Sequence, residues 1–188
     1  MQKMNKALLI IDIQNDYFEN GSAELVGSAE ASANAQQILE KFRNENRPVI
    51  HIQHIANRPN ATYFLPGTSG TEIHKNVTPK SDEKIIIKHF PNSFRETGLL
   101  AYLRSNTITD LAICGMMTHM CVDATTRAAK DYGLNCVVIG DACATKDLEL
   151  SGNKVEAADV QSAFLSALNH FYATVMTTEQ YLKDEVRN

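Results

Sequence analysis

Three reactive side chains follow short apolar runs of the chain. Asp12 and Lys88 each come directly after a run of aliphatic residues, and Cys121 comes a few residues after a third run. A thiol attacks as its thiolate, and a nearby cation or helix N-terminus lowers its pKa. We expect both effects at Cys121, with Asp12 taking the thiol proton and passing it to a leaving amine. Backbone N–H groups before the helix could receive the oxyanion. The three residue types predict acyl transfer to Cys121.

The apolar pattern predicts β-α-β units that would bring these side chains to one edge of a sheet. The runs are continuously hydrophobic, as is typical of parallel strands covered on both faces, and segments of helical period separate them. We therefore expect an α/β fold with three layers (α/β/α) around a six-stranded, mainly parallel, Rossmann-like sheet. The expected strands are Ala7–Ile11, Val49–His54, Lys84–Lys88, Asp110–Gly115, Asn135–Gly140 and Ala173–Met176.

The segments between the strands differ in character. The connection from Ile55 to Glu83 contains three prolines and shows little periodicity, and long loops inside compact domains are usually functional. We expect it to form the wall of a pocket or an interface. Four other segments show a helical stripe or end at a glycine, which predicts helices at 31–42, 99–103, 118–132 and 155–171.

Length and composition narrow the class of protein. The chain has 188 residues, 44% hydrophobic and 21% charged, which predicts one globular domain over residues 1–188. Its formal net charge of -4 disfavours nucleic acid and membrane surfaces as partners and favours a small-molecule substrate. No apolar run is long enough for a membrane span or a signal-peptide core. We therefore expect a cytoplasmic protein with reduced cysteines.

Four segments occur in an order and spacing that are typical of one family: Asp12–Tyr17, Ile87–Lys88, Gly115–Val122 and Gly140–Ala144. They resemble the isochorismatase-like cysteine hydrolases, and the resemblance covers nearly the whole chain. It implies a catalytic triad of Asp12, Lys88 and Cys121 that works through a thioester. It also implies a cis peptide between Met116 and Met117, with the backbone N–H groups of Met117 and Cys121 as the oxyanion site. Relatives are commonly oligomers, so the resemblance implies a homo-oligomer, either a dimer or a tetramer.

The chain departs from the metal-assisted branch of this family. Nicotinamidases of that branch carry an Asp-x-His pair after the second strand, where this chain reads His54-Ile55-Ala56. We therefore expect neither a metal nor another cofactor. The pairs Cys114/Cys121 and Cys136/Cys143 have six intervening residues each, more than structural zinc sites typically have. Cys114 and Cys136 are interpreted as buried packing residues, and Cys143 is left without a role.

Several aromatic residues and histidines are candidates for substrate contact. Tyr17, Phe18, Phe64 and Phe90 could supply the apolar walls of a small-molecule pocket. His54 ends the second expected strand, and His119 precedes Cys121 by two residues. Core packing, or a turn role for His119, is the alternative in each case. His51 is interpreted as a packing or interface residue, and no role is assigned to His74, His89 or His170.

Three functions remain open from the sequence. The first is hydrolysis of a C–N bond in a small amide or imide through a thioester on Cys121. The second is vinyl-ether hydrolysis of the isochorismatase type, with Asp12 as the acid. The third is a non-catalytic binding or thiol-sensing module in which Cys121 is reversibly oxidised. Nucleotide binding is disfavoured because no glycine-rich phosphate loop follows a strand.

Overall fold

A six-stranded parallel sheet forms the centre of the computed structural model, which describes residues 5–184. Its strand order is β3-β2-β1-β4-β5-β8, the order of a doubly wound Rossmann-like fold. All five strand pairs are parallel, which confirms the predicted sheet. The strands are β1 (Lys6–Ile11), β2 (Val49–His54), β3 (Lys84–Lys88), β4 (Asp110–Met116), β5 (Asn135–Ala144) and β8 (Thr174–Met176).

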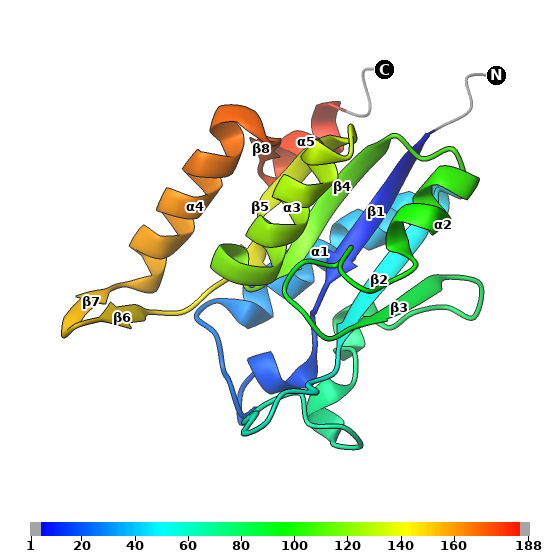
Figure 1. Ribbon diagram of the computed structural model, residues 1–188. Coiled ribbons are helices and arrows are strands. Elements are labelled where there is room, and N and C mark those ends of the chain that lie inside the picture. Colours follow the sequence, from blue (N-terminus) through cyan, green and yellow to red (C-terminus); the bar gives the residue numbers. More distant parts are fainter. Residues whose placement is uncertain (1–4, 185–188) are drawn as a thin grey trace.

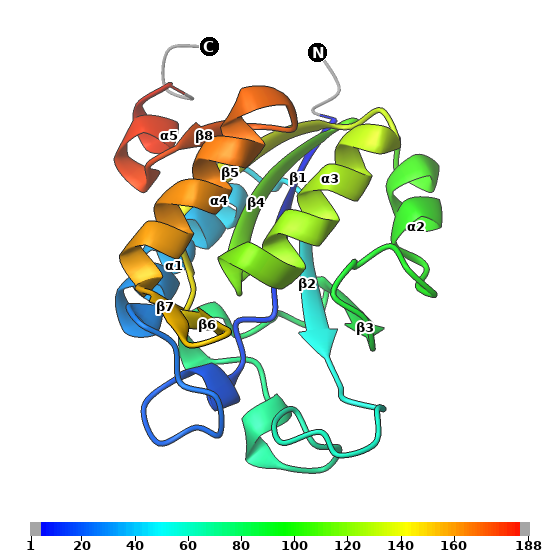
Figure 2. The same cartoon turned by 60° about the vertical axis from the view of Figure 1, so that its left-hand side comes forward.

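Helices cover both faces of this sheet, so the expected three layers are confirmed (Figures 1 and 2). One face packs against α1 (Ser28–Asn44) and α5 (Thr178–Asp184), and the other packs against α2 (Leu99–Ser105), α3 (Asp123–Asp131) and α4 (Ala157–Phe171). Successive side chains of a strand point to opposite faces. Every second residue of β1 therefore belongs to one core cluster and the residues between them to the other, which explains its unbroken hydrophobicity.

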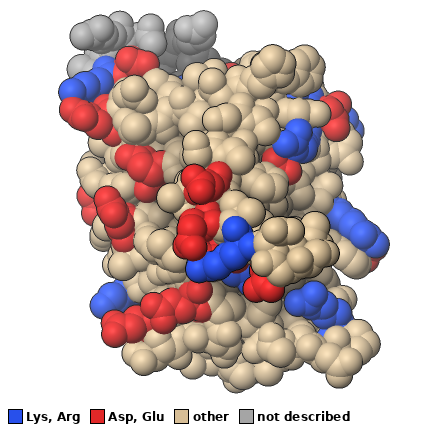
Figure 3. All heavy atoms as spheres, turned by 90° about the vertical axis from the view of Figure 1, so that its left-hand side faces the viewer, with Lys and Arg blue, Asp and Glu red and all other residues tan. Residues whose placement is uncertain are grey.

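Three elements were not predicted from the sequence. A small antiparallel hairpin, β6 (Leu148–Leu150) and β7 (Asn153–Val155), precedes α4, and α5 follows β8. The strand β5 also continues to Ala144, beyond the predicted end at Gly140. On the face that carries α4 and the hairpin, acidic and basic side chains lie scattered among uncharged ones (Figure 3). None of the helices described between residues 5 and 184 is long and apolar enough to cross a membrane.

A glycine allows β4 to approach β1 closely at the carboxyl edge of the sheet. Gly115 pairs with Ile11 and has a φ of 137°, and a Cβ atom there would lie 2.0 Å from the Ile11 carbonyl oxygen. A side chain at this position would therefore force the strands apart. Asp12 leaves β1 at the same level, so this contact fixes the distance between Asp12 and the segment that follows β4.

The long connection from β2 to β3 packs across the carboxyl end of the sheet. Apart from the short 3-10 turns η2 (Ser69–Thr71) and η3 (Lys75–Val77), it has no regular structure. It is joined to the segment after β1, which contains the turn η1 (Asn15–Tyr17), by hydrogen bonds from the Asn15 N–H to the Glu72 carbonyl and from the His74 N–H to the Ile13 carbonyl. Tyr63 and Phe64 of this connection line a pocket, which agrees with the expectation that it walls a pocket or an interface.

Candidate active site

The structure brings Asp12, Lys88 and Cys121 together at the carboxyl edge of the sheet. Asp12 follows β1, Lys88 ends β3, and Cys121 lies in a π-helical turn, η4 (Thr118–Val122), between β4 and α3. The Lys88 ammonium nitrogen is 2.7 Å from Asp12 Oδ2 and 3.2 Å from Cys121 Sγ. All three residues are buried. An ammonium therefore bridges a carboxylate and a thiol that are 109 positions apart in the chain.

Lys88 reaches this position from a strand that is not adjacent to β1. β2 lies between β3 and β1, and its last residue, His54, is paired in register with Lys88. The lysine side chain passes the end of β2, where its nitrogen lies 3.0 Å from His54 Nδ1 and 3.1 Å from the Phe90 carbonyl oxygen. The ammonium therefore contacts four groups that can accept its protons, although it has only three protons to donate.

Burial controls the protonation of the two acidic groups. It raises the pKa of Asp12, and the Lys88 charge offsets this only in part. Burial and the Asp12 charge raise the pKa of Cys121 to about 12, against the lowering effect of Lys88. The expected lowering of the Cys121 pKa is therefore wrong for the free protein, because loss of water around the sulfur outweighs the nearby cation.

One cation can compensate one negative charge in this buried site. Burial disfavours the Lys88 ammonium, but Asp12 and Cys121 together raise its pKa, so Lys88 stays protonated. Movement of the thiol proton from Cys121 to Asp12 transfers the negative charge from oxygen to sulfur and leaves the net charge of the three groups at zero. The arrangement can thus form a thiolate without gaining a second buried charge.

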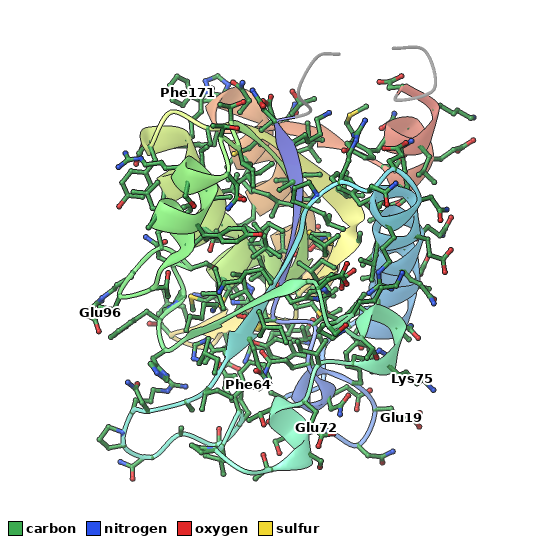
Figure 4. All side chains as sticks on the ribbon, turned by 90° about the vertical axis from the view of Figure 1, so that its right-hand side faces the viewer. Glu19, Phe64, Glu72, Lys75, Glu96 and Phe171 are labelled. Carbon is green, nitrogen blue, oxygen red and sulfur yellow. The ribbon has the colours of Figure 1, made fainter. Side chains whose placement is uncertain are left out.

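A pocket of about 220 Å³ opens onto Cys121. Tyr17, Tyr63, Phe64 and Phe90 form its aromatic walls, and the Tyr17 and Phe64 ring centroids lie 4.7 Å apart, edge to face. Phe64 belongs to the long connection and points inward, whereas Glu72 and Lys75 of the same connection point outward (Figure 4). A second, more open hollow of about 420 Å³ lies between α1 and α4, but none of the three reactive residues lines it. The smaller pocket is therefore the candidate substrate site.

Comparison with known proteins identifies the family. The model of the isochorismatase domain matches residues 6–180. The chain belongs to the isochorismatase family. It is 49% identical over 180 residues to the isochorismatase family protein YddQ of Bacillus subtilis, a match that spans 96% of this chain and all of that one. It is also 34% identical over 143 residues to a streptothricin hydrolase of Streptomyces noursei, covering 76% of this chain and 51% of that protein.

Solved structures show the same isochorismatase fold. A crystal structure assigned to the isochorismatase hydrolases, from Oleispira antarctica, superposes with a TM-score of 0.93 at 44% sequence identity. This superposition covers 97% of the present chain and 98% of the other. The isochorismatase family is a family of hydrolases, and the chain has its fold along nearly its full length.

Not every predicted substrate-contact residue of this isochorismatase-family protein lies in the pocket. Tyr17, His54 and Phe64 line it. Phe18 does not, because its ring stacks on His74 with 3.7 Å between the centroids. His119 also lies outside, where its Nδ1 is 2.6 Å from Thr145 Oγ1. Contact of Phe18 or His119 with a substrate in this pocket is therefore not supported.

The peptide bond before Met117 has the geometry that the family resemblance implies. The Met116–Met117 peptide bond is cis, and Met117 lines the pocket beside Cys121. The oxyanion role of the Met117 and Cys121 N–H groups stays a prediction. His51 is buried and lies 2.9 Å from a Glu83 oxygen, a structural contact away from the pocket. The thiols of Cys114, Cys136 and Cys143 are free and buried.

Two buried polar residues of the site were missed in the sequence. The Gln14 amide nitrogen donates to the carbonyl oxygens of His54 (2.9 Å) and Thr71 (2.8 Å), and its oxygen accepts the His54 N–H at 2.7 Å. The Asp16 carboxylate accepts the Phe64 N–H at 2.6 Å and the Ser22 N–H at 3.2 Å. Gln14 therefore fixes the end of β2, and Asp16 fixes the aromatic wall.

Three potential metal ligands surround the Lys88 ammonium. Asp12, His54 and Cys121 each offer one ligand atom, and these three atoms lie within 4.8 Å of one another. The Lys88 nitrogen is within 3.2 Å of all three groups. A cation bound by these atoms would have to displace the lysine, so the residues present fit an ammonium better than a metal ion.

Proposed function

We propose that this isochorismatase-family protein is a cysteine-dependent hydrolase that cleaves a C–N bond in a small amide or imide. The observation that carries the proposal is the Lys88 ammonium, which contacts Asp12 Oδ2 at 2.7 Å and Cys121 Sγ at 3.2 Å. Cys121 in turn lines an aromatic pocket. A buried thiol next to a proton acceptor and a fixed cation has the components of nucleophilic catalysis.

The first half of the reaction forms a thioester. Asp12 accepts the Cys121 proton as sulfur attacks the substrate carbonyl carbon, and the Lys88 ammonium stabilises the charge that develops on sulfur. The carbonyl oxygen becomes an oxyanion, for which we assign the Met117 and Cys121 N–H groups as donors. The C–N bond then breaks, and the protonated Asp12 gives its proton to the leaving nitrogen, which departs as ammonia or an amine.

The second half consumes water. Asp12, again a carboxylate, takes a proton from a water molecule as the water oxygen attacks the thioester carbon. The C–S bond breaks, and the thiolate recovers the proton from Asp12. The sum is one amide and one water converted to one carboxylic acid and one amine, so neither an oxidant nor a cofactor is consumed.

A screen of small amides and imides for release of ammonia or amine tests the proposal, with Cys121→Ala as the paired variant. We expect turnover by the parent enzyme, loss of at least about a thousandfold in the variant, and an unchanged melting temperature. Intact mass spectrometry of the parent during turnover should show an adduct equal to the acyl group. The adduct should be absent from the variant.

Two outcomes would contradict the proposal. Near-normal turnover of a vinyl ether by Cys121→Ala would assign the chemistry to Asp12 alone. Absence of any acyl adduct, together with reversible oxidation of Cys121 by peroxide, would favour a thiol sensor. Rapid alkylation of Cys121 by itself would not separate these functions, because both a nucleophile and a sensor react.

A further inference from the structure

His54 is held by contacts at both its backbone and its ring. Its N–H and carbonyl are both hydrogen-bonded to the buried Gln14 amide, and its Nδ1 lies 3.0 Å from the Lys88 nitrogen. The side chain is 17% exposed and lines the pocket that opens onto Cys121. His54 is therefore fixed between the reactive lysine and the space where a substrate would bind.

The contact with Lys88 determines where the imidazole proton lies. An ammonium donates and cannot accept, so the 3.0 Å contact favours the tautomer in which Nδ1 turns its lone pair towards Lys88. Burial, with a further contribution from the Lys88 charge, lowers the pKa of His54 to about 3, so the ring is neutral near pH 7. A neutral imidazole with a bare Nδ1 carries its single proton on Nε2. Among residues 5–184, Nε2 has no hydrogen-bond partner.

We propose that His54 is a substrate-recognition residue whose Nε2–H donates a hydrogen bond into the pocket and selects amides that carry an acceptor atom beside the reacting carbonyl. Among the described residues no carboxylate lines the pocket and Arg58 does, so the charge of the lining favours a ligand with acceptor atoms. The volume of about 220 Å³ suits a single ring, since a cavity of about 150 Å³ holds benzene. The inference rests on the proposed function only where it calls the ligand a substrate. The hydrogen bond itself can be measured without turnover.

Binding of benzamide and of the three pyridinecarboxamides compares ligands that differ in one ring acceptor. The Cys121→Ala background prevents turnover, and dissociation constants can be measured by NMR titration. We expect at least one pyridinecarboxamide to bind about three- to tenfold more tightly than benzamide, the range of one hydrogen bond.

Two substitutions of His54 separate its two nitrogens. In His54→Asn the side-chain amide reaches only the Nδ1 position, so the contact with Lys88 can be kept while the donor at Nε2 is lost. In His54→Gln the amide reaches the Nε2 position, so the donor is kept while the acceptor for Lys88 is lost. We expect His54→Asn to abolish the preference for the pyridine ligand and His54→Gln to retain it. His119→Asn, the same change outside the pocket, should leave the preference intact.

A second measurement follows the Lys88 contact in proteins that retain Cys121. The pH profile of Cys121 alkylation by iodoacetamide should shift in His54→Gln and stay near that of the parent in His54→Asn. Equal affinity for all four ligands, or a preference that survives in His54→Asn, would overturn the inference. Ligands that bind through His54 but are never hydrolysed by the parent enzyme would refute the proposed function instead, so the two failures are distinguishable.

Discussion

Replacement of Asp12 by asparagine should make Cys121 more acidic while it abolishes turnover. The Asp12 charge is one of the causes that raise the Cys121 pKa to about 12, whereas Lys88 lowers it. Without the carboxylate, the ammonium has no anion to pair with except the thiolate. The substitution also removes the proton acceptor, which we expect to lower kcat by about 10² to 10⁴. A lower pKa of Cys121 and a large loss of turnover should therefore occur together in this variant.

The size of the pKa change follows from the distance. The reactive atoms of Asp12 and Cys121 are at most 4.8 Å apart. At an effective dielectric constant of about 20, two unit charges at that separation repel by about 3.5 kcal/mol, or roughly 2.5 pKa units. At pH 8 this would raise the thiolate fraction about 300-fold. Because nucleophilicity falls as the pKa falls, the alkylation rate should rise only about twentyfold.

Iodoacetamide alkylation between pH 6 and pH 10, followed by intact mass, measures this change. Asp110→Asn is the matched control, because it removes the same charge at the amino end of β4 and should leave the profile unchanged. Circular dichroism and a melting temperature establish that each variant is folded. If Asp12→Asn were folded but alkylated at the parent rate, or more slowly, the charge-exchange account of the triad would be refuted.

Two further substitutions address the supports of the site and of the fold. Gln14→Ala removes the three hydrogen bonds that this buried amide makes with His54 and Thr71. It should lower the free energy of unfolding by about 2 to 3 kcal/mol in urea titrations, and a loss below about 1 kcal/mol would contradict its positioning role. Burial opposes ionisation of Glu83, but hydrogen bonds led by Arg43 lower its pKa to about 2. Its stabilising effect is therefore present above pH 4.5 and lost as the pH falls towards 2, so Glu83→Gln should flatten the acid limb of the stability profile; an unchanged limb would assign acid sensitivity to other groups.

The centre of the sheet was predictable because β1 and β4 are buried on both faces. β2 and β3 have the predicted bounds, although Ile85 and Ile87 of the edge strand β3 are exposed. β5 was predicted too short because, beyond a register shift opposite β4, Cys143 and Ala144 pair again with Gly115 and Met116. A run of apolar residues cannot indicate such a shift, since it depends on the neighbouring strand.

The missed elements carry a weak hydrophobic signal. α5 has seven residues, among which Tyr181 is the buried apolar side chain that anchors it. The β6–β7 hairpin is mostly exposed and pairs only with itself. Short or exposed elements are stabilised by the surface on which they lie. Their own residues therefore show neither the hydrophobic period of a helix nor that of a strand.

The reactive residues of the site were easier to predict than those that support them. Asp12 and Cys121 follow strands and Lys88 ends one, and ligands bind at the carboxyl ends of strands in this class of fold. Gln14 and Asp16 act on backbone groups 40 and 48 positions away, at His54 and Phe64, which no local pattern can indicate. The pKa of the thiol was misjudged for a similar reason, because burial is a property of the folded chain.

The path of the β2–β3 connection places one part of the pocket wall away from the reactive groups. The Ala56 N–H donates a hydrogen bond of 2.8 Å to the Phe64 carbonyl oxygen. This bond closes residues 57–63 into a small loop. This loop supplies Asn57, Arg58 and Tyr63 to the pocket, but none of the groups that contact the thiol. Exchange of residues 57–63 for those of a relative should therefore change this part of the pocket wall while the sheet, His54 and the contacts of Lys88 stay in place.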